Sequence, residues 1–362
     1  MAQADFRYLG AKLLLITDKV LRDLGVTAGV EARLADRVVI FDTVESDPSL
    51  ETVMAAVEIG ANEGVTGVIG LGGGSSMDVA KLAALLLGSG EDLDAAWGVG
   101  NAKGPRLPLV LVPTTAGTGS EVTPVSIISV GAGEKRGVSS PILLPDIAIL
   151  DPELTVGLPP AITAATGIDA MVHAIEAYTS RSPNNNPISK MLATQALDLL
   201  GANIETAVTN GEDIEARGAM LMGSMLAGMA FANSPVAAVH ALAYPIGGIF
   251  HVPHGLSNAL ILAQVMRFNV SECGAEYAEL APHIFPDIDT KQGAQAICAE
   301  FIECLTDLSL RIGLPPRLRD VGIPESAIER MAKDAMIQTR LLVNNPREVS
   351  EADARNIYRA AW

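Results

Sequence analysis

The chain has 362 residues, which is the length of two domains, or of three at most. Its 25 Lys and Arg residues against 42 Asp and Glu residues give a formal net charge of −17, which argues against nucleic acid or an anionic membrane as the main partner. Hydrophobic residues make up 49% of the chain and charged residues 19%, a composition that fits a buried core and argues against disorder. The three cysteines form no Cys-x-x-Cys pair and the N-terminus has no signal-peptide pattern, so we expect a cytoplasmic protein without a disulfide framework.

The first half of the chain alternates short apolar runs with helical stretches. The runs that predict buried strands are residues 12–16, 38–41, 65–71 and 107–112. Helical spacing follows over residues 50–60 and 75–87. Nearly continuous apolar strands that alternate with helices indicate a parallel sheet covered on both faces. After about Asp151 only helical runs remain, so we predict an α/β domain over residues 1–153 and an all-helical domain over residues 154–362.

A glycine-rich turn follows the third apolar run. Its residues with candidate binding roles are Gly72, Gly73, Gly74, Ser75 and Asp78. Glycine lets the backbone approach a ligand closely, and the free N–H groups of the helix that follows attract an anion such as a pyrophosphate. The pattern is neither the G-x-G-x-x-G dinucleotide motif nor a P-loop. From the glycines alone, a phosphate site and a tight turn capped by Ser75 are equally good interpretations.

A hydroxyl-rich loop, Pro113–Glu121, follows the fourth apolar run. Thr114, Thr115 and Thr118 suit sugar and phosphate oxygens, although a plain hydroxyl-rich turn explains them equally well. Two such loops after neighbouring parallel strands favour a ligand site, because open α/β sheets bind ligands at that edge. Asp18, at the end of the first run, has two interpretations: it accepts hydrogen bonds from a ribose, or it is a helix N-cap.

One carboxylate and several histidines fall in charge-poor sequence of the second half. Asp169 and His173 are separated by four residues and share a helix face, and His240 and His254 are 14 residues apart. One carboxylate with two or three imidazoles is a ligand set for iron or zinc, whereas an ordinary helical pair is the alternative for Asp169 and His173. Glu176 lies on the same face, where it either orients a ligand imidazole or is a plain helix carboxylate.

Residues 218–266 contain no Asp, Glu, Lys or Arg, which is long enough for a membrane span. Asn233, Pro235 and Pro245 interrupt the segment, so we predict a deeply buried helical core instead. Three methionines at helical spacing are expected to pack in that core, namely Met222, Met225 and Met229.

Five motifs occur together in this order: GGGSSMD, PTTAGTGSE, GIDAMVHAIEAY, VHALAYPIGGIFHVPHG and NPREVSEADARNIYRAAW. Together they closely resemble the iron-containing (group III) alcohol dehydrogenases, from about Lys12 to Trp362. The resemblance implies a dinucleotide-binding α/β domain and a helical domain in a dehydroquinate-synthase-like architecture, with the active site in the cleft between them.

The resemblance also assigns expected roles to residues. It implies that NAD is bound by the glycine turn, Gly72–Asp78, and by the loop Thr114–Ser120. Lys135 falls where the family often has a lysine that contacts the cofactor, and Asp18 matches a position that favours NAD over NADP. The implied metal is Fe(II), with Zn(II) as the alternative. Its implied ligands are Asp169, His173, His240 and His254.

Two features depart from the family pattern. Many members have a histidine at the position of Tyr244, which therefore either relays a proton through its hydroxyl or shapes the pocket. Family members usually begin with an additional strand and helix, and this chain is expected to lack them. A strand and helix of usual length would take about 20–30 residues. In relatives that segment can help to form a dimer. A homo-oligomer, namely a dimer, is expected here, and a different assembly is the alternative for a chain without the segment.

The resemblance therefore implies a metal-dependent oxidoreductase that transfers a hydride between NAD(H) and a small primary or secondary alcohol, aldehyde or ketone. The alternatives are a hydroxyacid–oxoacid transhydrogenase, which shares a tyrosine at the position of Tyr244, and a maleylacetate-type reductase. The PTTAGTGSE and NPRE motifs disfavour a lyase of the dehydroquinate synthase type, and the intact metal ligands disfavour a non-catalytic binding protein. The expected partner is a small molecule, with no nucleic acid and no membrane.

Overall fold

The computed structural model describes residues 9–131 and 134–362 of the chain. It divides the chain into two compact units. Unit 1 contains the described residues up to Thr115 together with Gly119–Thr155, and unit 2 contains Ala116–Thr118 together with Val156–Trp362.

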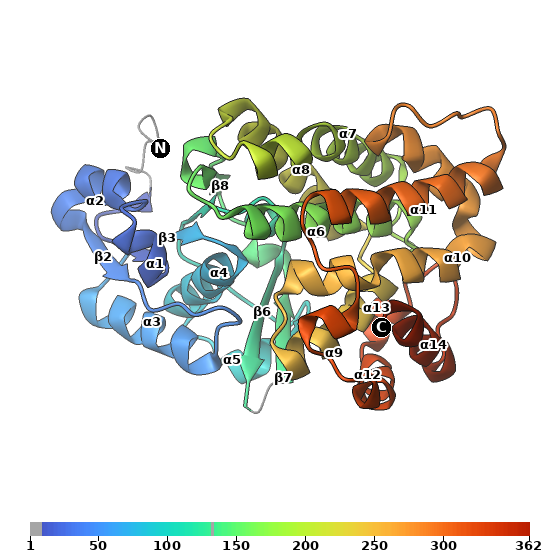
Figure 1. The fold of residues 1–362 in the computed structure, drawn as a ribbon. Helices are drawn as coiled ribbons and strands as arrows, with labels where there is room; N and C mark the ends of the chain where they lie inside the picture. The colour runs from blue at the N-terminus through green and yellow to red at the C-terminus, as the bar shows by residue number, and fades with distance from the viewer. Residues whose placement is uncertain (1–8, 132–133) are drawn as a thin grey trace. The chain divides into compact units, whose positions relative to one another are not determined.

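The main sheet of unit 1 has five parallel strands in the order β2-β1-β3-β5-β8 (Figure 1). The strands are β1 Leu13–Ile16, β2 Val38–Phe41, β3 Gly67–Gly72, β5 Leu109–Pro113 and β8 Ile147–Ala148. In the register, Leu13 lies opposite Val38 on one side and Gly67 on the other, and Gly72 of β3 lies opposite Pro113 of β5. The predicted parallel sheet is therefore confirmed.

Helices cover both faces of this sheet. They are α1 Lys19–Asp23, α2 Ala28–Leu34, α3 Leu50–Glu63, α4 Gly74–Ser89 and α5 Leu93–Ala96. Because successive side chains of a strand point to opposite faces, Leu14 packs in one apolar cluster with residues of α3 and α4, while Leu13 packs in another with residues of α2. Burial on both sides explains why β1, β3 and β5 are almost wholly apolar.

A second, three-stranded sheet in unit 1 was not predicted from the sequence. It contains β4 Gly98–Val99, β6 Val125–Val130 and β7 Glu134–Ser139, with β6 and β7 antiparallel. The strand β7 begins with three charged residues, Glu134, Lys135 and Arg136, and is only partly buried. A half-exposed strand of this composition lacks the apolar run that identified the parallel strands.

Unit 2 is helical throughout its described residues, so this part of the predicted fold class is confirmed as well. Its helices are α6 Pro160–Thr179, α7 Pro187–Thr209, α8 Ile214–Asn233, α9 Ala238–Phe250, α10 His254–Ile284, α11 Ala294–Arg311, α12 Ile328–Ala335, α13 Thr339–Leu342 and α14 Glu351–Ala361. Helix α6 packs against α7, α8 and α10 and has buried residues on all sides (Figure 1). This central helix carries the first of the candidate metal ligands.

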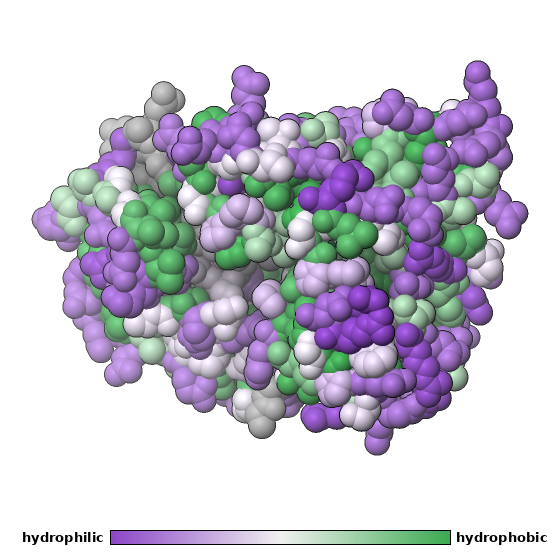
Figure 2. All heavy atoms as spheres, in the orientation of Figure 1, coloured by the Kyte–Doolittle hydropathy of each residue, from purple (hydrophilic) through white to green (hydrophobic). Residues whose placement is uncertain are grey.

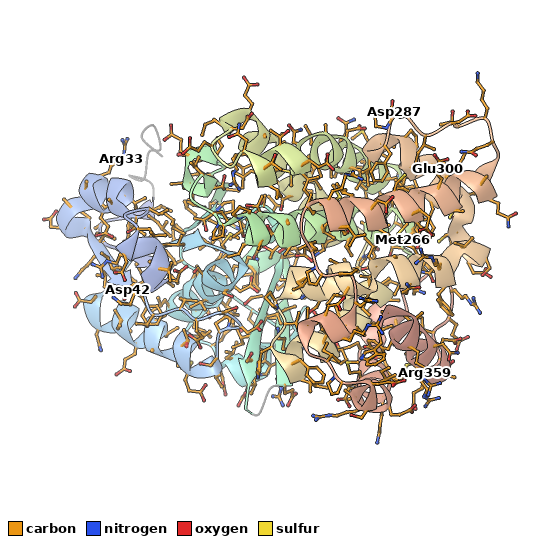
Figure 3. All side chains as sticks on the ribbon, viewed as in Figure 1. Arg33, Asp42, Met266, Asp287, Glu300 and Arg359 are labelled. Atoms are coloured by element: carbon orange, nitrogen blue, oxygen red, sulfur yellow. The ribbon has the colours of Figure 1, made fainter. Side chains whose placement is uncertain are left out.

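Side chains of unit 2 are either buried in its core or exposed on its surface. Met266 of α10 is 1% exposed, whereas Glu300 of α11 and Arg359 of α14 project outward (Figure 3). Hydrophilic and apolar side chains are interspersed on the face seen in Figure 2. Within the described residues, no single helix has the length and hydropathy of a membrane span, and α8 and α9 reach these values only as a pair bent by 108°.

The expectation that the methionines of α8 pack in the core is wrong for two of them. Met222 is 41% exposed and Met229 is 38% exposed. Helix α8 packs through its small residues instead: a Cβ atom on Gly223 would lie only 2.8 Å from Cγ of Leu200 in α7. Close contact on the small-residue face turns these two methionines away from the core.

Candidate metal centre and cofactor loops

Three acidic or imidazole side chains of α6 lie on one face of that helix. Asp169, His173 and Glu176 occupy positions i, i+4 and i+7, and each side chain is almost completely buried. Burial of two carboxyl groups without a nearby Lys or Arg partner is costly unless other groups compensate for their charge. The geometry around them shows which groups do so.

The other two histidines reach this face from α9 and α10. His240 lies in the first turn of α9, and His254 is the first residue of α10. Gly255 allows the start of α10 to approach α6, because a Cβ atom there would lie 2.4 Å from the carbonyl oxygen of Ala165. Only glycine permits such an approach, which brings His254 to Asp169.

The four side chains form a compact donor cluster. One donor atom from each of Asp169, His173, His240 and His254 lies within 4.8 Å of all the others. The carboxylate Oδ1 of Asp169 is 3.9 Å from Nε2 of His240 and 3.7 Å from Nε2 of His254. Ligand atoms about 2.1 Å from a tetrahedral ion are about 3.4 Å apart, so these separations are close to those of a divalent metal site.

Hydrogen bonds to Nδ1 fix which nitrogen of each inner imidazole is free. Nδ1 of His173 is 3.1 Å from the carbonyl oxygen of Gly117, and Nδ1 of His240 is 2.7 Å from Oε2 of Glu176. Both partners accept, so each Nδ1–H donates and leaves the Nε2 lone pair for another group. Nε2 of His240 is buried and has no hydrogen-bond partner. An unpaired lone pair at this place fits a metal ion.

The protonation states also fit a metal ion. Burial lowers the pKa of His173 to about 3, so its imidazole is neutral near pH 7. Burial on its own raises the pKa of Asp169, but the neighbouring imidazoles outweigh it and hold that pKa below its ordinary value. A neutral imidazole and an ionised carboxylate are the forms that bind metals.

Glu176 orients His240 and caps α9 at the same time. Its carboxylate accepts hydrogen bonds from Nδ1 of His240, from the backbone N–H of Ala237 at 3.0 Å and from that of Val239 at 2.7 Å. Ala237 is the N-cap residue of α9 and has no side chain that could cap it, so Glu176 supplies the cap from α6. Of the two interpretations of Glu176, the structure favours the one in which it orients an imidazole.

The two predicted cofactor loops begin side by side in unit 1, whereas Ala116–Thr118 of the second loop belongs to unit 2. They follow β3 and β5, which are neighbouring parallel strands, and the backbone N–H of Thr114 donates to the carbonyl of Gly72 at 3.0 Å. A Cβ atom on Gly73 would lie 3.6 Å from Oγ1 of Thr115. The expectation that both loops follow neighbouring parallel strands is therefore confirmed.

Helix α4 begins directly after the glycine turn. Its N-cap is Gly73, so the alternative of a turn capped by Ser75 is wrong. The first intrahelical hydrogen bond runs from the N–H of Met77 to the carbonyl of Gly73. The N–H groups of Gly74 and Ser75 precede it, and such groups at a helix start attract anions.

The remaining predicted cofactor residues have internal partners. One carboxylate oxygen of Asp18 accepts from the N–H of Leu21 at 2.9 Å, so Asp18 is the N-cap of α1. Lys135 of β7 forms an ion pair with Asp47 at 2.6 Å. Thr118 belongs to the short segment that clusters with unit 2.

A buried lysine that the sequence analysis missed connects the two loops. Nζ of Lys81 in α4 lies 2.7 Å from Oγ of Ser120, 3.2 Å from Oγ1 of Thr123 and 2.7 Å from the carbonyl oxygen of Val125. Ser120 in turn donates to Oδ1 of Asp78 at 2.7 Å. Lys81 is wholly buried, and its three acceptors match the three N–H bonds of an ammonium group. The only sequence signal was a lysine within the apolar run of α4.

Glu121 lies next to this network and predicts a pH effect on stability. The side chain is 2% exposed, and burial raises its pKa from 4.5 to about 7 although Lys81 opposes the shift. Between these two pH values the folded chain keeps a proton that the unfolded chain has lost, so stability falls as pH rises, by about 3 kcal/mol in all. We expect Glu121→Gln to remove this fall, as measured by urea unfolding across that range.

Glu91→Gln is the matched control for this prediction. Although burial raises the pKa of Glu91, the N–H groups of Lys103 and Gly104 donate to its carboxylate and hold that pKa below its ordinary value. The pKa of Glu91 lies below 4.5, so between pH 4.5 and 7 the control should keep the pH dependence of wild type. Only below 4.5 should it lose stability relative to wild type as pH rises, which is the opposite sign. An unchanged pH dependence in Glu121→Gln would contradict the raised pKa of Glu121.

Tyr244 lies one turn after His240 on α9. Its ring centroid is 6.2 Å from that of His254, and its hydroxyl oxygen accepts a hydrogen bond from Nη2 of Arg340 at 3.2 Å. Because Arg340 can only donate, the hydroxyl proton of Tyr244 is not used in this contact.

A parallel α/β unit together with a helical unit that carries a cluster of Asp and His donors is the arrangement expected of a metal-dependent dehydrogenase. Comparison with known proteins narrows this class. Residues 2–152 match the family model described as iron-containing alcohol dehydrogenase, and residues 163–362 match that of the Fe-containing alcohol dehydrogenase family, C-terminal. The chain belongs to the iron-containing alcohol dehydrogenase family.

Individual relatives cover nearly the whole chain. Long-chain-alcohol dehydrogenase 1 of Geobacillus thermodenitrificans is 43% identical over 99% of this chain and 91% of its own length. A crystal structure of 1,3-propanediol oxidoreductase superposes with a TM-score of 0.94 at 35% identity, covering 99% of this chain and 94% of that one. Sulfoacetaldehyde reductase from Bifidobacterium kashiwanohense, solved in complex with NAD+, has a TM-score of 0.87 at 31% identity, covering 98% and 92%.

Proposed function

We propose that this alcohol dehydrogenase uses NAD and one Fe(II) ion to interconvert small alcohols with aldehydes or ketones. The observation that carries the proposal is the buried, unpaired Nε2 of His240, which lies 3.9 Å from the Asp169 carboxylate. We assign the ion to Asp169, His173, His240 and His254, with Zn(II) as the alternative ion because the same ligands suit both. When bound, the ion supplies Lewis acidity at the substrate oxygen, and the nicotinamide supplies the hydride acceptor.

The charges of the buried cluster support a divalent cation. Asp169 and Glu176 are two buried carboxyl groups that both accept hydrogen bonds, and Nδ1 of His173 and of His240 each face an acceptor. A divalent cation would offset negative charge on such buried carboxyl groups. The hydrogen bond from Nδ1 to Glu176 prevents the His240 ring from rotating, so Nε2 stays directed at the cluster.

For the cofactor we propose two kinds of residue. The N–H groups at Gly72, Gly73, Gly74 and Ser75 would bind the pyrophosphate, and Thr114, Thr115 and Thr118 would bind phosphate or sugar oxygens. Asp18 would contact the ribose, and Lys135 would contact the cofactor. Asp78 is proposed to act by holding the loop through Ser120, because its Oδ1 and Oδ2 accept from Ser120 and from the N–H of Ile127.

For the proton we propose Tyr244. When a carbonyl compound is reduced, its oxygen must gain a proton, and the Tyr244 hydroxyl keeps its own proton available while it accepts from Arg340. Arg340 would hold the hydroxyl in place. We further propose a homo-oligomer.

The test is anaerobic NAD+ reduction with a panel of short alcohols and diols. Metal-stripped chain is reloaded with Fe(II) or with Zn(II), and NADH absorbance is followed. We expect turnover that depends on the added metal. NAD binding without turnover under either metal would contradict the dehydrogenase. Turnover of a hydroxyacid with a 2-oxoacid acceptor and no added NAD would identify the transhydrogenase instead.

A further inference from the structure

A buried asparagine on α10 touches two of the proposed metal ligands. Asn258 is 0% exposed and lies one turn after His254, so the two residues share a helix face. The close approach of Gly255 to α6 places this face against Asp169, since a Cβ on Gly255 would also lie 3.3 Å from Cβ of Asp169. Asn258 is therefore held where two ligand-bearing helices meet.

The amide nitrogen of Asn258 bridges these helices. Nδ2 donates to Oδ1 of Asp169 at 2.6 Å and lies 3.3 Å from Nε2 of His254. Both contacted atoms belong to the donor cluster, and they are 3.7 Å apart. A single NH2 group thus contacts the carboxylate from α6 and the imidazole from α10 at once.

The other end of the amide shows that this side chain is not simple packing. Oδ1 of Asn258 is buried and has no hydrogen-bond partner. An unsatisfied buried oxygen is destabilising, whereas a leucine of similar size would fill the space without leaving an unpaired polar atom. The contacts made by Nδ2 are the feature that a leucine could not reproduce.

We propose that Asn258 is a positioning residue for metal binding. Its amide holds the Asp169 carboxylate so that Oδ1 is turned toward the three histidines. The inference rests on the proposed metal site. A carboxylate on a helix can rotate about its side-chain bonds, and the 2.6 Å hydrogen bond restricts that rotation before any ion arrives.

The test replaces Asn258 by leucine and measures zinc affinity directly. The full, metal-stripped chain is titrated with Zn(II) against a chromophoric chelator, which gives a dissociation constant that does not depend on activity. We expect Asn258→Leu to weaken zinc binding by about 10–100-fold, the usual effect of losing a group that orients a ligand. Thermal melting with and without Zn(II) should show a correspondingly smaller metal-induced rise.

Asn269→Leu is the matched control. Asn269 lies on the same helix and is 2% exposed, but its amide bonds to Asn345 and to the hydroxyl of Tyr277 instead. The control should lose stability and keep wild-type zinc affinity. If Asn258→Leu does not fold by circular dichroism, Asn258→Ala is titrated in the same way.

The outcomes separate the inference from the function on which it rests. Wild-type affinity in the Asn258 variant, or an equal loss in the Asn269 control, would overturn the positioning role and leave the metal site intact. A wild-type chain that binds no zinc and no Fe(II) would overturn the metal site itself, and the inference with it.

Discussion

His240→Ala is expected to abolish metal binding and to lower kcat/KM by about a thousandfold or more. Nε2 of His240 is the buried, unpaired donor of the cluster, and Lewis acidity at a reacting oxygen contributes several kcal/mol, each 1.36 of which is about tenfold in rate. The fold should survive, because Glu176 still accepts from the N–H groups of Ala237 and Val239 and so still caps α9. NAD affinity should stay at the wild-type value. Metal content, NAD affinity and steady-state kinetics measure the three parts of this prediction.

His283→Ala is the control for that experiment. His283 lies on α10, away from the cluster, and pairs with Asp198 at 2.8 Å on a partly exposed surface. Its replacement should leave metal content and turnover unchanged. Wild-type turnover in the His240 variant would refute the metal mechanism.

Lys81→Met is expected to lower the free energy of unfolding of unit 1 by about 3–5 kcal/mol, the usual cost of breaking a buried ion pair. The variant leaves the half-buried Asp78 without the ammonium that lies 3.6 Å away, and it leaves the carbonyl of Val125 without its donor from Lys81. Because Lys81 connects α4 to the loop that carries Ser120, NAD affinity should fall as well. Urea unfolding followed by circular dichroism, and NAD titration, measure these effects.

Lys12→Met removes a lysine of the same unit in a different setting. Lys12 pairs with Glu63 where both side chains are more than a third exposed, and such surface pairs contribute about 0–1 kcal/mol. The control should therefore unfold close to wild type. A Lys81 variant no less stable than this control would show that the buried network contributes little.

The parallel sheet could be predicted because it is buried on both faces. Strands such as Leu13–Ile16 and Leu109–Pro113 carry apolar side chains on both sides, which leaves a continuous run in the sequence. The β6–β7 hairpin could not be predicted, because one of its strands begins with Glu134, Lys135 and Arg136 and is only half-buried. The exposure of Met222 depended on which face of α8 met α7, which spacing alone does not determine.

Part of the candidate site could likewise be predicted from the sequence, and part could not. Asp169 and His173 share a helix turn, so their proximity follows from helix geometry. The positions of His240 and His254 depend on the turn between α9 and α10 and on the close approach at Gly255. Asn258 was missed because its partner Asp169 is 89 residues away, and no local pattern distinguishes a bridging asparagine from an ordinary polar residue.

The most direct test of the account is a titration of the metal-stripped chain with Fe(II) under anaerobic conditions, with NADH formation measured after each addition. We expect activity to rise in proportion to added metal and to stop rising at one equivalent per chain. The rise should match the amount of metal that the wild type binds, and His240→Ala should show neither bound metal nor activity. Full activity in the metal-stripped chain, or a rise with no break at one equivalent, would contradict it.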